Sequence, residues 1–185
     1  MKLFATLPLL ILLSCSTKNS IERKVTIKPI GWQFPLTTET IFIDSAFNST
    51  GEVIAEIPGD GPSLKLFTIK DSLFGSFRAF LRKDTLQYKD WKIWHDKDTK
   101  WFFEQIEKLP QIQLLEKDYY VTTIDSAPFL VQYNKYVKES SADTFYLYNY
   151  FGRINDIELN INFEYNKESI GKKYMNIINR SKFVD

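Results

Sequence analysis

The sequence predicts a single-domain α+β fold built around an antiparallel sheet. Strand-like segments dominate the chain, and its two helix-like segments do not alternate with them regularly. The segment 157–165 has the cleanest alternation. Its apolar residues, which point one way, are Ile157, Leu159, Ile161 and Phe163, and the polar residues between them are Glu158, Asn160, Asn162 and Glu164. An antiparallel sheet with one face on a core and one face towards water or polar neighbours produces this pattern.

The first part of the chain contains a series of short strand signals. The expected strands cover 25–30 running into 31–35, then 41–44, 52–57, 64–69, 74–81 and, least clearly, 87–94. The segment 58–62 reads Pro-Gly-Asp-Gly-Pro and predicts a turn, because glycine accepts positive φ and proline fixes its own φ.

A first helix is predicted over 98–109. Its apolar face consists of Phe102, Ile106 and Leu109. These residues are spaced by four and three positions, which places them on one side of a helix. Asp98 or Thr99 can cap its start, and Pro110 stops its end.

A second helix is predicted from Glu168 to about Arg180. Its apolar stripe consists of Ile170, Tyr174, Ile177 and Ile178, and Asn166 is a plausible cap. Gly171 weakens this helix by ~1 kcal/mol relative to alanine, so packing must hold it. Between the two helices, strands are expected over 111–115, 119–124, 128–137 and 144–151, followed by the strand 157–165.

Composition excludes several classes of protein. Of 185 residues, 44% are hydrophobic and 16% aromatic, which is enough apolar area to exclude disorder for most of the chain. One cysteine excludes a disulfide scaffold, and one histidine argues against a histidine-based metal enzyme.

The first fifteen residues carry a targeting signal. Lys2 precedes an apolar stretch that ends at Leu13, shorter than the ~20 residues that span a bilayer. The stretch closes with Leu-Leu-Ser before Cys15, which resembles the lipobox of bacterial lipoproteins. The resemblance implies lipid transfer to the Cys15 thiol and cleavage before it. A plain signal peptide that happens to end near a cysteine, or a free thiol, is the alternative.

The expected organisation is therefore a signal peptide at 1–14, a lipidated polar tether at 15–24 and one globular domain at 25–185. Cleavage would remove Lys2 and leave 23 basic and 23 acidic side chains. Such a balance provides no long-range attraction to nucleic acid or anionic lipid, so we expect no nucleic-acid partner. Membrane attachment then depends on Cys15 alone.

The sequence offers few groups for catalysis. His95 is the only histidine, and we expect it on the surface in a turn. Asp96 and Asp98 beside it are the best candidates for metal ligands, but lysines lie among them and Ca²⁺ needs several oxygen ligands. We therefore expect no catalytic residue, no metal and no cofactor, although Ser-Lys pairs brought together by the fold stay open.

Aromatic residues are the strongest functional signal. Most are expected in the core or half-buried on the sheet, because aromatic side chains favour strands. In 145–151, Tyr146, Tyr148 and Tyr150 share one face. The opposite face carries Phe145, Leu147, Asn149 and Phe151. If that second set packs on the core, the tyrosine row is a candidate docking surface, since tyrosine combines apolar area with a polar tip.

The order of elements resembles the PsbP-like superfamily. The resemblance is carried by Gly-Trp-Gln-Phe-Pro at 31–35, by the aromatic strand 145–152 with 157–163 after it, and by the closing segment 174–183. It implies an antiparallel sheet sandwiched by helices in an α/β/α arrangement. Known members include a photosystem II subunit, a yeast Ran-binding factor and small bacterial lipoproteins, and they act as binding or assembly factors. No metal ligand or Ran-contact residue of these members can be matched here.

Three functional hypotheses follow. The first is a non-enzymatic lipoprotein of the bacterial envelope that binds a protein or peptide near the membrane. The second is a carrier of an apolar or sugar ligand, with Trp91, Trp94 and Trp101 lining its pocket. The third is a hydrolase of unrecognised type.

Overall fold

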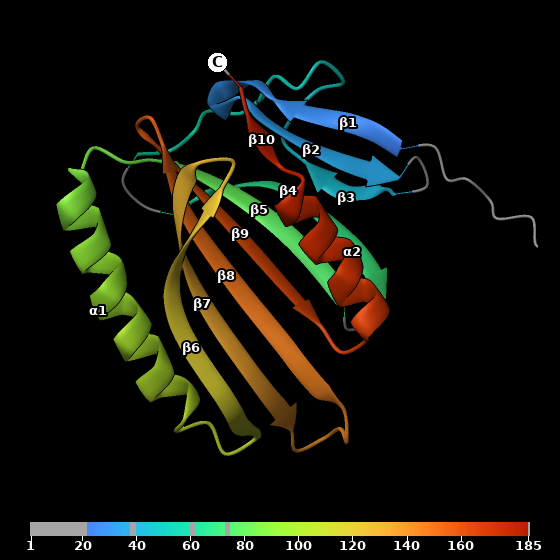
Figure 1. The fold of residues 1–185 in the computed structure, drawn as a ribbon, viewed down its shortest axis with the longest axis vertical. Coiled ribbons are helices and arrows are strands. Elements are labelled where there is room, and N and C mark those ends of the chain that lie inside the picture. Colours follow the sequence, from blue (N-terminus) through green and yellow to red (C-terminus); the bar gives the residue numbers. More distant parts are fainter. Residues whose placement is uncertain (1–21, 38–39, 60–61, 73–74, 185) are drawn as a thin grey trace, which may run out of the picture.

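The computed structural model describes residues 22–37, 40–59, 62–72 and 75–184. They form a seven-stranded sheet of order β3-β4-β5-β9-β8-β7-β6 and a three-stranded sheet of order β1-β2-β10 (Figure 1). The large sheet contains β3 (Phe42–Ser45), β4 (Leu64–Ser72), β5 (Gly75–Lys83), β6 (Ile112–Ile124), β7 (Ala127–Lys138), β8 (Thr144–Ile154) and β9 (Ile157–Tyr165). The small sheet contains β1 (Glu22–Ile27), β2 (Trp32–Thr37) and β10 (Lys182–Phe183), and the helices are α1 (Tyr88–Ile106) and α2 (Glu168–Asn179). All strand pairs are antiparallel, which confirms the α+β prediction.

The two helices cover opposite faces of the large sheet. On β8, the Tyr150 hydroxyl donates to the Met175 sulfur of α2 at 3.9 Å. The next residue, Phe151, points the other way, and its ring centroid lies 4.4 Å from that of His95 in α1. The small sheet lies beside α2 (Figure 1). The α/β/α arrangement that the resemblance implied is therefore present, with a small sheet completing one layer.

The main core lies between the large sheet and the layer formed by α2 and the small sheet. Its largest fully buried members are Trp32, Phe34, Phe67, Phe77, Phe129, Phe163 and Tyr174. Register aligns Phe77 with Phe163 across β5 and β9, and their rings stack at 5.6 Å. Tyr174 of α2 packs on both rings. The predicted inward face of 157–165 and the stripe of the second helix are thus confirmed, because burial of such large rings stabilises this layer.

A second, smaller core lies under α1 and corrects one prediction. The segment 87–94 forms no strand; it begins α1, whose N-cap is Gln87 and whose last residue is Ile106. Trp91, His95 and Thr99 recur every four residues, and all three are buried against the sheet. This spacing fits a helix, and burial of its first two turns outweighs the strand preference of aromatic residues. Neither Asp98 nor Thr99 caps the helix, since both lie in its middle.

The segment 52–57, expected as a strand, makes only an isolated bridge between Val53 and Phe47. The Asn48 side chain accepts backbone hydrogen bonds from Thr50 and Glu52, and Gly51 has φ of 82°. This local turn competes with strand pairing. The turn expected at 58–62 falls partly outside the described residues.

Three boundaries also differ from the sequence predictions. The segments 111–115 and 119–124 join into β6, with a bulge between Leu114 and Glu116. Asn166 does not cap α2, whose N-cap is Lys167. The side-chain amide of Asn166 donates to Asp143 instead. Residues 22–24, assigned to the tether, belong to β1.

Candidate docking site on the tyrosine face

The three tryptophans proposed as a pocket are separated by the geometry of α1. Trp91 is fully buried, whereas Trp94 and Trp101 are 44% and 59% exposed. Trp94 lies under the Arg82 guanidinium, which is 5.4 Å from its ring centroid. Since Trp91 faces the sheet and the other two lie on a flank of the helix, the three indoles do not enclose one ligand.

The predicted tyrosine row lies on the same side of the sheet as α2. Tyr150 is buried, with 5% of its surface exposed, while Tyr146 and Tyr148 are half-buried. Strand pairing brings further tyrosines beside them. We call the tyrosine face the set Tyr120, Tyr133, Tyr146, Tyr148 and Tyr165, which come from β6, β7, β8 and β9.

The register of the sheet explains why these rings meet. Tyr148 lies opposite Tyr133 on β7, and Tyr146 lies opposite Tyr165 on β9. The ring centroids of the first pair are 4.8 Å apart and those of the second pair 5.1 Å apart. The buried Phe163 supports Tyr148 at 5.1 Å. Sequence reasoning missed Tyr133, Tyr165 and Tyr120, because cross-strand neighbours depend on register.

A glycine lets the face continue up to α2. The Tyr165 ring packs so closely on Gly171 that a Cβ built there would lie 2.4 Å from it. Gly171 lowers the intrinsic stability of the helix, but its lack of a side chain leaves room for the Tyr165 ring against α2.

Four hydroxyl groups of this face, those of Tyr120, Tyr133, Tyr148 and Tyr165, are held in their neutral form by raised pKa values. Burial, followed by the nearby charge of Glu116, raises the pKa of Tyr133 to about 12. Burial, followed by the charge of Asp118, raises the pKa of Tyr120 above its ordinary value. Burial also raises the pKa of Tyr148 and of Tyr165. Neutral hydroxyls can donate and accept hydrogen bonds, so the face offers apolar rings with polar tips.

Two hollows lie at the ends of the face. One, of about 370 Å³, is lined by Tyr120, Tyr150 and Ile178 with the β6–β7 turn. The other, of about 390 Å³, is lined by Tyr146, Tyr165 and the start of α2. A partner lying along the face would have a recess at each end.

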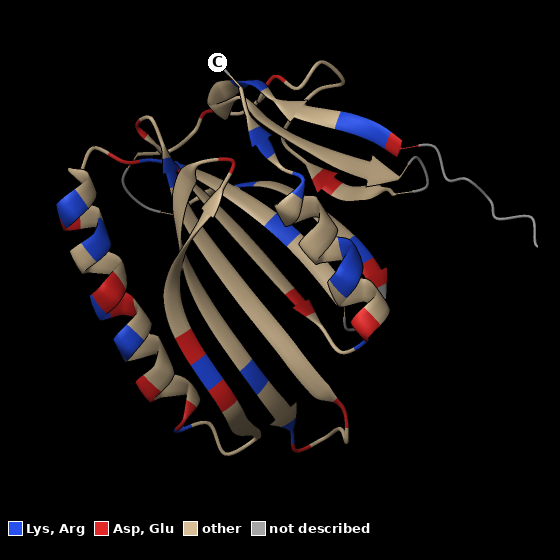
Figure 2. Ribbon diagram, viewed as in Figure 1, with Lys and Arg blue, Asp and Glu red and all other residues tan. Residues whose placement is uncertain are grey.

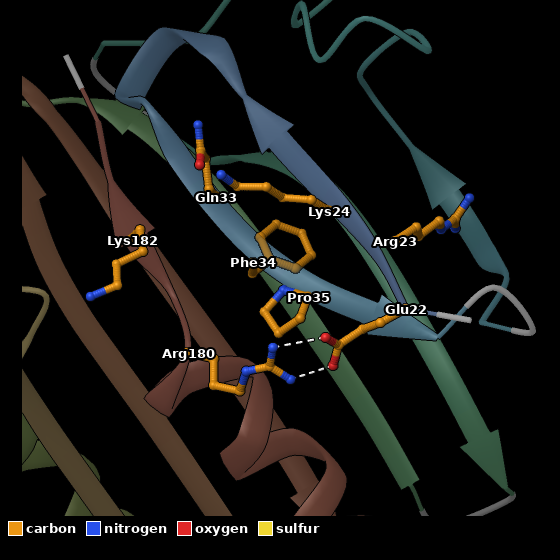
Figure 3. Close-up of a pocket in the computed structure, with 8 residues that line it drawn as sticks. All are labelled: Glu22, Arg23, Lys24, Gln33, Phe34, Pro35, Arg180 and Lys182. Carbon is orange, nitrogen blue, oxygen red and sulfur yellow. Dashed lines mark hydrogen bonds and ion pairs between the residues drawn. The ribbon is translucent and has the colours of Figure 1, made fainter. Parts of the chain in front are cut away.

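A third pocket, of about 250 Å³, lies on the small sheet and is basic (Figure 3). Among the described residues, two of the four cations that line it form ion pairs. Arg180, just after α2, forms an ion pair with Glu22 of β1 through both terminal guanidinium nitrogens, and Lys182 pairs with Asp125 at 3.1 Å. The Arg180 hydrogen bond holds the pKa of Glu22 below its usual value. We interpret this pocket as a structural contact in which the Arg180–Glu22 ion pair joins β1 to the end of α2.

His95 lies in α1 with 1% of its surface exposed, which corrects its expected place in a surface turn. Its Nε2 lies 3.0 Å from Glu158 Oε2. The same oxygen accepts hydrogen bonds from Trp91 Nε1 at 2.7 Å and Arg82 Nη2 at 3.0 Å. Burial alone would raise the pKa of Glu158, but these donors outweigh it and lower that pKa. This buried hydrogen-bonded cluster holds α1 against the sheet, and neither His95 nor Glu158 is accessible to a substrate from solvent.

Within the described residues, no three His, Cys, Asp or Glu side chains converge as metal ligands. In the same part of the chain, no helix is long and apolar enough to span a membrane. Cys15 lies outside the described residues, as do Lys2 and the rest of the signal segment.

The two helices and the two antiparallel sheets form an α+β protein with the PsbP-like fold. The chain matches no protein-family model and no curated protein by sequence. Its structure is similar to the cyanobacterial PsbP protein CyanoP of Synechocystis, with a TM-score of 0.57 and 8% identity, covering 94% of this chain and 99% of CyanoP. It is also similar to LpqN of Mycobacterium tuberculosis, with a TM-score of 0.51 and 11% identity, covering 89% of this chain and 91% of LpqN.

A weaker similarity connects the chain with the Ran-binding protein Mog1p of Saccharomyces cerevisiae. The TM-score is 0.45 at 9% identity, covering 90% of this chain and 97% of Mog1p. At these identities the similarities to CyanoP and LpqN establish the fold alone.

Proposed function

We propose that the protein is a lipid-anchored docking module of the bacterial cell envelope. It is tied to a membrane through Cys15 and binds a protein or peptide through the tyrosine face, without catalysing a reaction. The observation that carries the proposal is the half-open layer of stacked tyrosine rings across β6, β7, β8 and β9. Tyrosine is enriched at binding hot spots because it buries a large apolar ring and keeps a polar tip.

The envelope location is supported by two observations. The lipobox-like residues before Cys15 end an apolar segment of signal length. The fold is also that of LpqN, a protein described as involved in cell envelope biogenesis. Two acyl chains on Cys15 would anchor the module stably where a single chain would not.

A binding role fits the chemistry of the face better than catalysis. The raised pKa values keep the hydroxyls of Tyr120, Tyr133, Tyr148 and Tyr165 protonated, so none of these four is prepared to act as a base at neutral pH. The one histidine is buried with Glu158 on the opposite side of the sheet. The face therefore offers contact area and hydrogen bonds, which is what docking requires.

Photo-crosslinking tests the docking role. A photoreactive phenylalanine replaces Tyr133 in cells that produce the protein, and the matched control carries it at Lys97, an exposed position of α1. We expect a light-dependent adduct from the Tyr133 position alone, and its loss when Tyr148→Arg is added. Equal adducts from both positions, or an adduct that survives Tyr148→Arg, would reject the tyrosine face as the docking site.

Lipidation has a separate test. We expect Cys15→Ala to abolish the mass increment of the acyl chains and to leave an uncleaved or released species, while Ser16→Ala preserves both lipid and cleavage. Intact-protein mass spectrometry of the membrane fraction measures this. An unmodified Cys15 in protein isolated from native membranes would remove the anchor from the proposal.

A further inference from the structure

The tyrosine face ends at a free strand edge. In the large sheet, β6 is the terminal strand and pairs only with β7 within the described residues. In Figure 1 it lies at the end of the sheet away from α2, with α1 beside it; α1 contacts it through side chains, such as Asp96 with the Tyr119 hydroxyl at 2.9 Å. Such an edge presents unpaired backbone groups that another extended segment can complete.

The β6–β7 turn shows which backbone groups point outwards. Asp125 and Ser126 have φ of 46° and 71° and form a two-residue turn that joins Ile124 to its partner Ala127. In such a hairpin the flanking residues are hydrogen-bonded to each other, and the direction alternates along the strand. The N–H groups of Tyr119 and Val121 therefore point away from β7.

A local contact agrees with this assignment. The backbone N–H of Tyr119 donates to the side chain of Asp118 at 2.8 Å. An aspartate that satisfies a neighbouring N–H at a strand edge occupies the place that a partner strand would take.

On its tyrosine side, the edge strand β6 carries two acidic residues, Glu116 and Asp118, whereas Lys117 between them forms an ion pair with Glu107 beyond the end of α1. Glu116 and Asp118 alternate along β6 opposite Lys135 and Tyr133 of β7, so they share the side of the sheet that carries the tyrosine face. Both are exposed, and among the described residues neither forms an ion pair. Lys135 instead lies over the Tyr146 ring, 5.9 Å from its centroid. Two carboxylates are thus left at the rim of an aromatic surface, while the neighbouring cation is engaged elsewhere.

From this arrangement, and resting on the docking role proposed above, we propose that the partner is an extended basic peptide segment. It adds to the outer edge of β6 as a further strand. Every second side chain of an added strand lies on the tyrosine side. Lysine or arginine at two such positions would face Glu116 and Asp118 and reach the tyrosine rings, where cations bind favourably. Such a peptide would be recognised by backbone hydrogen bonds to β6 and by positive charges at alternate positions.

A second copy of this chain is a poorer occupant. Complete overlap of two antiparallel β6 strands sets Asp118 against Asp118 of the other copy, and like charges directly opposite each other are destabilising. A basic strand in the same place converts this repulsion into attraction.

The test uses the full mature protein extracted from membranes in detergent. The probe is a capped heptapeptide with lysine at its second, fourth and sixth positions and valine or threonine between them. The matched probe carries glutamate in place of lysine. We expect binding of the lysine peptide by calorimetry and slower hydrogen exchange within 116–123. Equal affinity for the two peptides, or unchanged exchange in β6, would overturn the proposal.

Two variants separate charge from backbone pairing. Glu116→Gln with Asp118→Asn keeps the hydrogen-bond acceptors and removes both charges, and we expect the Kd for the lysine peptide to rise about fivefold. Val121→Pro removes an outward N–H without removing a bond to β7, and we expect it to abolish the slowed exchange. Its circular dichroism and melting temperature are measured to verify folding. Unchanged affinity in the charge variant of the folded protein would overturn the proposal.

The two proposals fail in different ways. If the crosslink from position 133 disappears with Tyr148→Arg but survives Glu116→Gln with Asp118→Asn, the docking role stands and the basic-peptide partner is rejected. If the control position gives the same crosslinks as position 133, the docking role itself fails.

Discussion

The two faces of the large sheet are made by the same strands but differ in their side chains and in how far a helix covers them. On the α1 face, charged and amide groups bond to one another beneath the helix: Glu158 takes three donors, and Asn149 donates to Gln132 at 2.7 Å. On the tyrosine face, the rings stack on one another, and several of them are only half-buried. We call the α1 face the sealed face, because its polar cluster is buried under the helix. We call the tyrosine face half-open, because its rings beyond α2 are only partly buried.

The difference shows that alternation along a strand does not decide which face is exposed. The polar side of β9 carries Glu158, which is buried because α1 crosses it. The aromatic side of β8 carries Tyr146 and Tyr148, which are only half-buried because α2 does not extend over them. Figure 2 shows charged residues of both signs along α1 and across β6, at the boundary between the faces.

Removal of Glu158 would break the sealed face and has the largest expected effect. Glu158→Ala leaves Arg82, His95 and Trp91 without their common acceptor in a buried site. We expect a loss of about 3–5 kcal/mol in the free energy of unfolding, because the part-buried Arg82 charge and the buried donors of Trp91 and His95 lose their acceptor. Denaturant unfolding measures it, with the exposed Glu104→Ala as control. A loss no larger than that of the control would show that the cluster does not hold α1.

Gly152 tests the packing on the opposite side. A Cβ at this position would lie 2.2 Å from the Phe129 ring, which is fully buried. We expect Gly152→Ala to cost about 1–3 kcal/mol, since the ring must shift within a close-packed core. Gly59→Ala, where a Cβ would meet nothing within 4 Å, is the matched control in the same thermal unfolding experiment.

The sealed face should also confer a pH dependence. The pKa of Glu158 is lowered by folding from the unperturbed value of 4.5, so its contribution is complete above that value and is lost as pH falls through the lower folded pKa. We expect the stability advantage of wild type over Glu158→Gln to shrink on acidification below 4.5. A constant difference between the two proteins from pH 7 to pH 3 would contradict this assignment.

The half-open face has the smallest expected effect on stability but a spectroscopic signature. Since the Glu116 charge contributes to a Tyr133 pKa of about 12, Glu116→Gln should lower that pKa. Ultraviolet titration of tyrosinate absorbance measures the shift, and Tyr133→Phe identifies the transition. A titration curve unaffected by Glu116→Gln would mean that the acidic rim does not reach the tyrosine hydroxyls.

Sequence reasoning found one row of the candidate site and missed its neighbours. Tyr146, Tyr148 and Tyr150 follow from alternation within a single strand. Tyr133 and Tyr165 join them only through the registers of β8 with β7 and β9. The helical start of α1 was missed for a related reason: Trp91 and His95 have helical spacing, but only the sheet beneath them makes that spacing decisive.

Local pattern was sufficient for the α+β class, the inward face of 157–165 and the stripe of α2, because each depends on neighbours along the chain. The exposure of Tyr148, the burial of His95 and the free edge of β6 were decided by tertiary structure. Each of these depends on which distant element lies over a given strand, and spacing along one segment carries no information about that.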